Sequence, residues 1–411
     1  MTTGKEAGEI ADTQIALLGL YLELYDHSMP EMRPREKTMN YSAKEFGATG
    51  NGKSFDTSSI QRAIDTCSSE GGGKVVIGPG VHLTKTLYLR SHVELHVEAG
   101  AKLQGSENPD DYDDFKAEGF KHEFAAEGNT KCLICASGVE NSAITGAGEI
   151  NGAGPAFYNT DIPADQPFYD KPEISRPRMI LLYECRNIKM EDTSFVDSPC
   201  WTMWLIACEQ VNIHRVKVLG DQKMINNDGI DIDSCRNVTI SDSFLKTGDD
   251  CIVVRAIQPV LEKPAICQRV TVTNCVLDSC CQGIRVGCPS DNIIRNCTFS
   301  NLVIDGVGNG INMDNPKRYL QADNNGRMDL HDIMFSNIII KSHRHPIRIY
   351  VEDGIRLQRL SGIVFSDIRA ESVSPVTLTG CPETIIEDIR FNNVQIETTA
   401  GTPIVCSHCR G

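Results

Sequence analysis

The sequence predicts an all-β protein whose chain winds into a right-handed, single-stranded parallel β-helix with an N-terminal capping helix. Two observations support this fold class: a strand phrase recurs along the chain, and an amphipathic helix precedes its clearest copies. Each phrase places a polar or turn residue before an apolar–any–apolar run, as in CysArgAsnIleLysMet at 185–190. The first apolar residues of eight copies stand 23 to 40 residues apart, at Ile188, Val211, Val238, Val270, Ile293, Ile333, Ile363 and Ile389.

Each phrase alternates with period 2, which is typical of a short strand with one apolar face. A single strand cannot cover that face within its own repeat, so successive repeats must stack, and the unequal intervals place the variation in loops. A propeller would need four strands per unit, and a leucine-rich repeat would need LxxLxL phrases. Two stretches, 106–131 and 153–178, depart from the rhythm and are expected to be long loops. Such loops often carry binding function, and loops without a function are the alternative.

A capping helix is expected directly after Asp56, which is a suitable N-cap residue, and it should end at the glycines 71–73. Its apolar residues recur with helical spacing, at Ile60, Ala63, Ile64 and Cys67. Such a helix would cover the open end of the solenoid, where strand edges are otherwise exposed. Strands are expected to follow at 75–77 and 87–89.

The N-terminal residues 1–40 are expected to form a helical extension, and residues 41–411 the β-helix. The apolar run Ile15–Leu22 is too short to span a membrane and follows acidic rather than basic residues, so it does not resemble a secretory leader. We therefore expect a cytoplasmic protein. The alternative is a secreted protein from which a leader has been removed.

Composition disfavours several classes of partner. The chain has 55 acidic and 40 basic residues, a net charge of −15, which argues against nucleic acid and anionic membranes. Seventeen cysteines include two Cys-x-x-Cys pairs, at 132/135 and 406/409. A four-thiolate zinc site is one interpretation of these pairs. We instead expect reduced, buried cysteines that act as small hydrophobic residues, and no metal or other cofactor.

Three aspartates form the main candidate site: Asp228 in AsnAsnAspGly, and Asp249 with Asp250 in GlyAspAspCys. Asp228 and Asp249 are 21 residues apart, close to one repeat, and stacked turns lie about 4.8 Å apart, so the three can share one patch of surface. Crowded carboxylates repel, so at least one pKa should rise. A protonated carboxyl beside ionised ones is what glycoside hydrolysis requires. On spacing alone, aspartates that merely form turns are the alternative.

The chain resembles glycoside hydrolase family 28, the polygalacturonase-like enzymes, over most of its length. The resemblance rests on PheGlyAlaThrGlyAsnGlyLys at 46–53, AsnAsnAspGly at 226–229 and GlyAspAspCys at 248–251. It implies a pectin-lyase-like β-helix that hydrolyses a pectin-related carbohydrate with inversion. By the same resemblance Asp249 would be the general acid, Asp228 and Asp250 would hold and deprotonate the water, and Asn226 would help to hold the sugar.

Two motifs depart from the family pattern. Cys281-Gln282-Gly283 stands where a Gly-His-Gly is expected, and Asn312-Met313-Asp314 stands where Arg-Ile-Lys would bind uronate carboxylates. Gln282 cannot carry a proton charge, and Asp314 would repel a uronate. We therefore expect a glycosidase that is not a standard polygalacturonase, with Gln282, Asn312 and Asp314 at its substrate site. Positive charge could return at Arg255 and Arg285.

Two other functions are possible on the same solenoid. One is a Ca²⁺-dependent polysaccharide lyase, in which clustered aspartates ligate the metal and Arg255 or Arg285 acts as the base. The other is a carbohydrate-binding β-helix without catalysis. A cytoplasmic hydrolase would act on imported oligosaccharides, which favours attack at chain ends. His343-Arg344-His345, with Arg348 and Tyr350, could line the same groove, although an ordinary loop face is the alternative.

Overall fold

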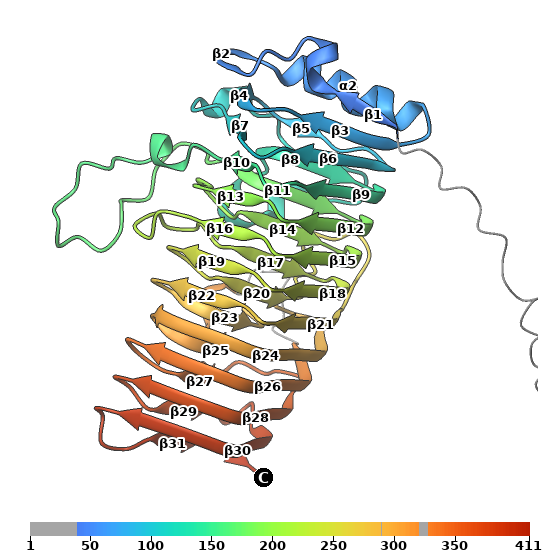
Figure 1. The fold of residues 1–411 in the computed structure, drawn as a ribbon. Helices are drawn as coiled ribbons and strands as arrows, with labels where there is room; N and C mark the ends of the chain where they lie inside the picture. The colour runs from blue at the N-terminus through green and yellow to red at the C-terminus, as the bar shows by residue number, and fades with distance from the viewer. Residues whose placement is uncertain (1–38, 289, 320–327) are drawn as a thin grey trace, which may run out of the picture. The chain divides into compact units, whose positions relative to one another are not determined.

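Strands stack turn upon turn from β1 (Asn40–Ser42) to β32 (Cys409–Arg410) in the computed structural model, which describes residues 39–411 apart from 289 and 320–327 (Figure 1). The pairings between the described strands are parallel, and the fold is the predicted parallel β-helix. The helical extension predicted for residues 1–40 lies outside the described residues as far as position 38. Among the described residues, no helix is long and apolar enough to cross a membrane.

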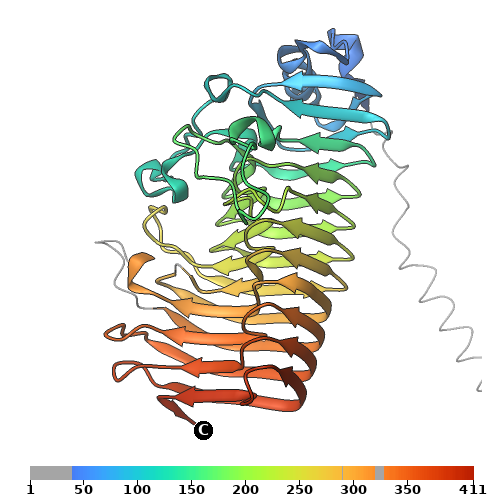
Figure 2. The ribbon, with the colours of Figure 1, turned by 90° about the vertical axis from the view of Figure 1, so that its left-hand side faces the viewer.

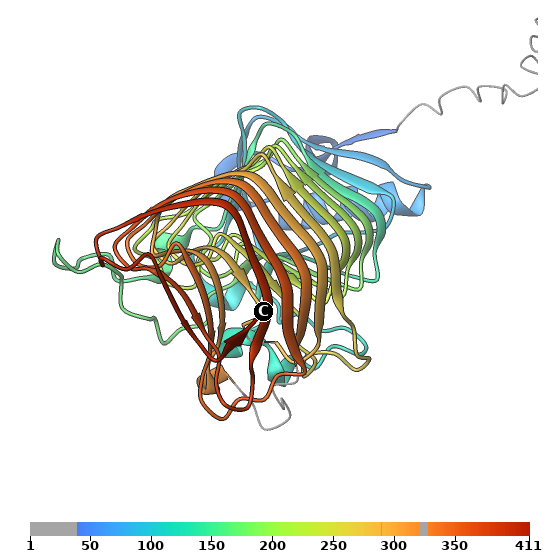
Figure 3. The same cartoon turned by 90° about the horizontal axis from the view of Figure 1, so that it is seen from below.

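Three ladders of strands form the faces of the coil, as the view along it in Figure 3 shows. The first ladder consists of β1, β3 (Gly73–Ile77), β6 (Val93–Val97), β9 (Glu140–Thr145), β12 (Arg186–Glu191), β15 (Glu209–His214), β18 (Arg236–Ser241), β21 (Cys267–Thr273), β24 (Ile293–Val307), β26 (Asp329–Ser342), β28 (Arg359–Ser372), β30 (Ile386–Thr398) and β32. The second ladder begins with β2 (Asn51–Phe55), β4 (Gly80–Thr84), β7 (Ala101–Gly105), β10 (Glu149–Asn151), β13 (Ser194–Val196), β16 (Lys217–Leu219), β19 (Phe244–Thr247) and β22 (Val276–Ser279). It continues in the later halves of the long strands β24 to β30.

The third ladder carries the functional site. Its strands are β5 (Leu87–Tyr88), β8 (Cys132–Ser137), β11 (Arg178–Tyr183), β14 (Met203–Ile206), β17 (Ile230–Asp233), β20 (Ile252–Arg255), β23 (Gln282–Val286), β25 (Asn309–Asn315), β27 (Ile347–Val351), β29 (Val376–Thr379) and β31 (Ile404–Ser407). Short 3-10 helices occupy Ala43–Phe46, Pro109–Asp111, His122–Phe124, Ala126–Gly128, Gly154–Phe157 and Lys317–Tyr319.

The recurring phrase forms the first ladder, and its apolar residues point into one continuous core. Val211 pairs with Ile188 and Val238, and Ile363 pairs with Ile333 and Ile389, as the repeat predicts. One copy was placed wrongly: Cys297, not Ile293, stacks on Ile333. Cys297 is buried like the aliphatic residues around it, because a reduced cysteine behaves as a small hydrophobic residue.

The predicted capping helix is α2 (Thr57–Ser69), which lies at the N-terminal end of the coil with Ile60, Ile64 and Cys67 fully buried (Figure 1). Asp56 occupies the N-cap position, where its backbone carbonyl accepts the Ile60 N–H but its side chain makes no hydrogen bond to the helix. Its carboxylate accepts hydrogen bonds from the backbone N–H groups of Thr49 and Gly50 and contacts His82 at 2.9 Å. Asp56 therefore joins the helix start to neighbouring turns.

All seventeen cysteines are free, and most of them are buried. Cys132 lies in β8, whereas Cys406 lies in β31, with eight strands of the third ladder between them. The two Cys-x-x-Cys pairs therefore cannot form a joint zinc site.

The two long loops lie on the outer side of the third ladder or project from the coil (Figure 2). The loop 106–131 packs its aromatic residues into a second hydrophobic cluster, separate from the core inside the coil, with Phe115, Phe120, Leu181, Tyr183, Trp201, Trp204, Val260 and Leu261 among its members. The loop 153–178 contributes Tyr158, which packs against the core. Both loops reach the site described next.

Candidate active site

A cavity of about 890 Å³ opens on the outer face of the third ladder. It is lined from the turn before β14, at Trp201, to β27, at Tyr350. Eight of the nine candidate site residues line this cavity: Asn226, Asp228, Asp249, Arg255, Gln282, Arg285, Asn312 and Asp314. The ninth, Asp250, is buried directly behind it. Winding the chain thus brings together residues that lie up to 88 positions apart.

The three aspartates approach one another because they end equivalent loops on neighbouring turns. Asp228 precedes β17 by two residues, and Asp250 precedes β20 by two. Ile230 pairs with Ile252, so Asp228 and Asp250 stand at the same height on stacked turns. Asp228 and Asp249 both line the cavity, whereas only 1% of Asp250 is exposed. The predicted cluster is therefore present, with two of its three acids facing the cavity.

The two glycines that flank the aspartates, Gly229 and Gly248, stand where adjacent turns pack closely. Neither Gly229 nor Gly248 has a positive φ. A Cβ at Gly229 would lie 2.4 Å from the carbonyl oxygen of Cys251, and one at Gly248 would lie 2.1 Å from that of Met224. Glycine is needed here because the backbones of adjacent turns approach closely, rather than for a left-handed turn.

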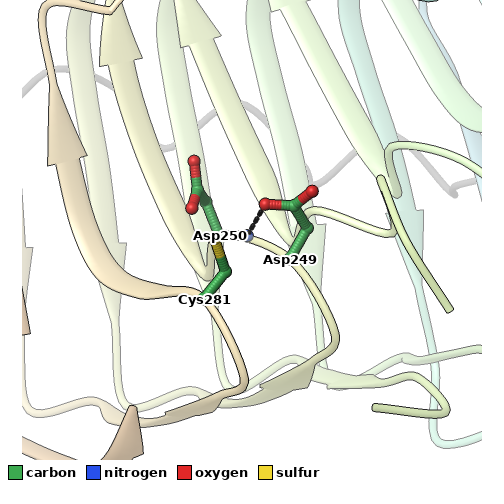
Figure 4. A group of neighbouring side chains, drawn as sticks. All are labelled: Asp249, Asp250 and Cys281. Carbon is green, nitrogen blue, oxygen red and sulfur yellow. Dashed lines mark hydrogen bonds between the residues drawn. The ribbon is translucent and has the colours of Figure 1, made fainter. Parts of the chain in front are cut away.

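The backbone around Asp249 is fixed by Asn227, a residue that the sequence analysis missed. The Asn227 Oδ1 atom accepts hydrogen bonds from the N–H groups of Gly248 and Asp249, at 2.7 and 3.0 Å, and its Nδ2 donates to the Asp221 carbonyl at 2.9 Å. The Asp249 carboxylate accepts the N–H groups of Asp250 and Asn226, at 3.0 and 3.2 Å (Figure 4). These N–H donors stabilise negative charge on Asp249.

Burial and mutual repulsion perturb the other acids. Burial raises the pKa of Asp228 well above its usual range, and the charge of Asp249 adds to the effect. Burial also raises the pKa of Asp250 to about 7, although the Arg285 guanidinium opposes it, and the pKa of Asp231 on β17 to about 7, against the opposing Arg255. One oxygen of Asp228 and one of Asp250 have no hydrogen-bond partner. The cluster therefore retains protons near neutral pH.

Arg285 joins two acids that come from different turns. Its Nη1 lies 3.1 Å from Asp250 Oδ2, and its Nη2 lies 3.1 Å from Asp314 Oδ1. Asp314 also accepts the Asn312 amide at 3.1 Å and lies 3.7 Å from Arg348. Arg285 therefore does supply positive charge near the aspartates, as the sequence suggested, but two carboxylates already balance it. Asp314 is bonded to cations and does not present an unpaired negative charge.

Arg255 is a buried structural cation more than an open binding group. Only 3% of it is exposed, it is paired with Asp231, and its guanidinium lies 4.4 Å from the centre of the Trp201 ring. Gln282, which replaces the expected histidine, accepts the Asn309 amide at 2.7 Å and donates to Cys281 Sγ. It fixes the turn beside the aspartates by hydrogen bonds alone.

Asn226 has a left-handed backbone, with φ of 57°, and its side-chain oxygen accepts Arg176 Nη2 at 3.0 Å. Arg176 also donates to the Tyr158 hydroxyl and the Ile225 carbonyl, at 2.6 and 2.9 Å. The sequence does not point to Arg176, because its partners are Tyr158 in the loop 153–178 and the backbone carbonyl of Ile225, two turns further along the coil. The long loop therefore shapes the site through a buried guanidinium.

Further lining residues come from two places that the sequence left open. Arg344, His345, Arg348 and Tyr350 line the cavity around β27, whereas His343 does not. Glu127, from the loop 106–131, faces it at the other end. Within the part of the chain that the structure describes, no carboxylate pairs with Arg344.

Carboxylate oxygens of Asp249 and Asp250 and the Sγ atom of Cys281 lie within 4.8 Å of one another (Figure 4). This set is a poor match to Ca²⁺, because the thiol is a soft ligand and calcium prefers six to eight oxygens. Asp250 is also already bonded to Arg285. The donor set thus gives little support to a calcium-dependent lyase.

A parallel β-helix with a carboxylate-lined groove is an architecture suited to cleaving carbohydrate chains, and comparison with known proteins makes the class specific. Residues 67–409 match the family Glycosyl hydrolases family 28. The chain belongs to this family and is a glycosidase.

Individual relatives agree with this assignment. The chain is 28% identical to a probable polygalacturonase of Vitis vinifera over 245 residues. The aligned region covers 58% of the chain and 48% of that protein. It is 24% identical to an endo-polygalacturonase of Pectobacterium carotovorum subsp. carotovorum, over 79% of the chain and 80% of that protein. The structure superposes on an exopolygalacturonase of Thermotoga maritima with a TM-score of 0.70 and 20% identity, covering 89% of the chain and 88% of the other. That likeness concerns the fold.

Proposed function

We propose that the protein is an inverting glycosidase that hydrolyses a pectin-related carbohydrate, with Asp249 as general acid and Asp228 and Asp250 as the groups that hold and deprotonate the attacking water. The observation that carries this proposal is the shared cavity of Asp228 and Asp249, which reach it from neighbouring turns. A sugar bound there would contact one acid from each turn.

The electrostatics of the cluster support acid–base chemistry. Hydrolysis of a glycoside needs one protonated and one ionised carboxyl group in the same site. Burial raises the pKa of Asp228 and of Asp250, so the cluster can hold a proton beside an ionised carboxylate near neutral pH.

We also propose that the sugar unit at the cleavage point carries no carboxylate, so the enzyme is not a standard polygalacturonase. Asn312 and Asp314 occupy the positions at which the family pattern places uronate-binding cations, and Arg285 is engaged by two carboxylates. Positive charge stands instead at Arg344 and Arg348, on the next turn. A pectic chain of mixed composition would place a neutral sugar unit beside the aspartates and an acidic sugar unit beside Arg344 and Arg348.

Replacement of Asp249 by asparagine tests the catalytic proposal, and Asp305→Asn, at an exposed position on β24, is the matched control. Loss of a general acid typically costs about 10²–10⁴-fold in rate. The loss should be large with pectic oligosaccharides and small with aryl glycosides whose leaving group needs no proton, whereas Asp228→Asn should be equally damaging with both. The anomer formed first, followed by proton NMR, tests inversion. Unchanged turnover of the Asp249 variant on oligosaccharides would refute the assignment.

A further inference from the structure

The outer face of the third ladder changes character between β14 and β17. The column that passes through Leu181 and Trp204 continues as Asp231, and the column through Tyr183 and Ile206 continues as Asp233. Strands β11 and β14 are therefore apolar on both faces, which is typical of strands that are covered on both sides. From β17 onward the inner face stays apolar while the outer face turns polar or charged in most strands, so the groove is divided along its length.

Two loops cover the apolar part. Phe120, from the loop 106–131, forms an isolated antiparallel bridge with Leu261, from the loop that follows β20. The Lys121 N–H donates to the Val260 carbonyl at 3.0 Å, and the Glu262 N–H donates to the Gly119 carbonyl at 2.9 Å. The ring of Phe120 packs edge-on against Tyr183 and Trp204, at centroid distances of 5.4 and 6.1 Å. The loops are thus joined to each other and packed on the strands beneath.

The boundary of this cover lies beside the aspartates. The Arg178 guanidinium lies 5.0 Å from the Trp201 ring and 4.6 Å from the Trp204 ring, and it donates to the carbonyls of Ala126 and Asn129. Glu127, from the same loop, lies 3.7 Å from the buried Arg176. These contacts form a packed wall across the groove, which we call the closed end.

Among the described residues, the opposite end of the groove stays partly exposed, and we call it the open end. Arg348 and Tyr350 on β27 remain partly exposed, and on β29 Thr377 and Thr379 continue the same two columns, also partly exposed. Trp201 of the closed end belongs to the turn next to that of Asp228, whose carbonyl accepts the Thr202 N–H at 2.8 Å. Adjacent turns are about 4.8 Å apart, which leaves room for one sugar ring between the wall and the cleavage point.

We infer that the enzyme binds the end of a pectic chain against the closed end and removes one terminal sugar at a time, the remaining chain extending over β23, β25 and β27. This inference rests on the proposed function of the aspartates and adds the site of attack along the chain. Because the apolar cluster fills the groove beyond Trp201, a chain cannot continue past the aspartates in that direction, and internal bonds are excluded from the site. The positive charge at Arg344 and Arg348 then lies beneath sugar units that are distant from the terminal sugar.

The test uses the full-length protein and fluorescently end-labelled oligosaccharides of defined length, prepared from homogalacturonan, rhamnogalacturonan and xylogalacturonan. At early times we expect a single monosaccharide and the chain shortened by one unit, from whichever class is hydrolysed. Intermediate fragments in the first samples would overturn the inference and leave the glycosidase assignment intact. Absence of cleavage throughout the set would instead overturn the proposed function, and the inference with it.

Glu127, which is partly exposed, and Arg344, which is exposed, provide an independent test. Glu127→Gln at the closed end should lower kcat/KM by a similar factor for every chain length, because each substrate places its terminal sugar there. Arg344→Ala at the open end should lower kcat/KM several-fold for longer acidic chains and by a clearly smaller factor for the disaccharide. Equal effects of Arg344→Ala on all lengths, or effects of Glu127→Gln on long chains alone, would contradict the placement of the chain end.

Discussion

Removal of the positive charge at Arg285 should move the acid limb of the pH–rate profile to higher pH. The Arg285 Nη1 atom lies 3.1 Å from Asp250 Oδ2, and the side chains are 12% and 1% exposed. At an effective dielectric constant of about 20, two unit charges at that distance interact by about 5 kcal/mol. Arg255 remains nearby and water can enter the vacated space, so we expect about 1–2 pKa units of this effect to be observed in Arg285→Gln.

The sign follows from the role of Asp250. If Asp250 helps to deprotonate water, it must be ionised, and the rate rises with pH through its pKa, which lies near 7 in the intact protein. Loss of the opposing guanidinium raises that pKa, so the limb moves upward and kcat at neutral pH falls by about 5–50-fold. Because Asp250 can take up a proton, the variant should fold, which circular dichroism verifies.

The assay is kcat against pH from 5 to 9 for the wild type, Arg285→Gln and Arg285→Lys. Lysine keeps the charge but not the planar fork that joins Asp250 to Asp314, so it should restore part of the shift. Arg295→Gln, on the first ladder and away from the cavity, is the matched control. An acid limb in Arg285→Gln that coincides with that of the wild type would refute the proposed role of the ion pair.

Three further predictions concern stability and metal dependence. Asp228→Asn should be more stable than the wild type at pH 8 and equally stable near pH 4. The pKa of Asp228 is higher in the folded than in the unfolded protein, so the wild type loses folding stability as the pH rises above the pKa of the unfolded state. Urea titrations at both pH values measure this difference, and equal stability of the two proteins at pH 8 would contradict it. Phe335→Ala should cost about 3–5 kcal/mol, since the ring is buried between Phe299 and Phe365, whereas Phe391→Ala, at the half-buried end of the stack, should cost clearly less. Dialysis against EDTA should leave hydrolysis unchanged; loss of activity with recovery on Ca²⁺, and an unsaturated product absorbing in the ultraviolet, would favour the lyase alternative.

The strand stack was predictable because it depends on local alternation. Ile188, Val211 and Val238 repeat the same phrase with few changes, and their inward faces need the next turn to be covered. The error at Ile293 has a physical cause: Cys297 fills the stack instead, and a search for aliphatic residues alone does not recognise a buried thiol.

The aspartates were predictable for a related reason, since 21 residues match one turn and stacked turns bring equivalent residues together. The partners of these acids were not predictable. Arg285 reaches Asp250 and Asp314 only because β23 pairs with both β20 and β25, a register that follows from loops of unequal length. Asn227 and Arg176 bond mainly to backbone groups, and a sequence motif carries no record of such contacts.

One signal in the sequence could have located the end of the groove. MetIleLeuLeuTyr at 179–183 and MetTrpLeuIle at 203–206 are continuously apolar, whereas IleAspIleAsp at 230–233 alternates. A strand on the surface of a β-helix that does not alternate must be covered outside as well as inside, so the first two segments demand a covering loop, and the third does not. The aromatic stretch 106–131 supplies that cover. Because the change falls one turn before Asp228, the same pattern that builds the fold also places Asp228 next to the covered part of the groove.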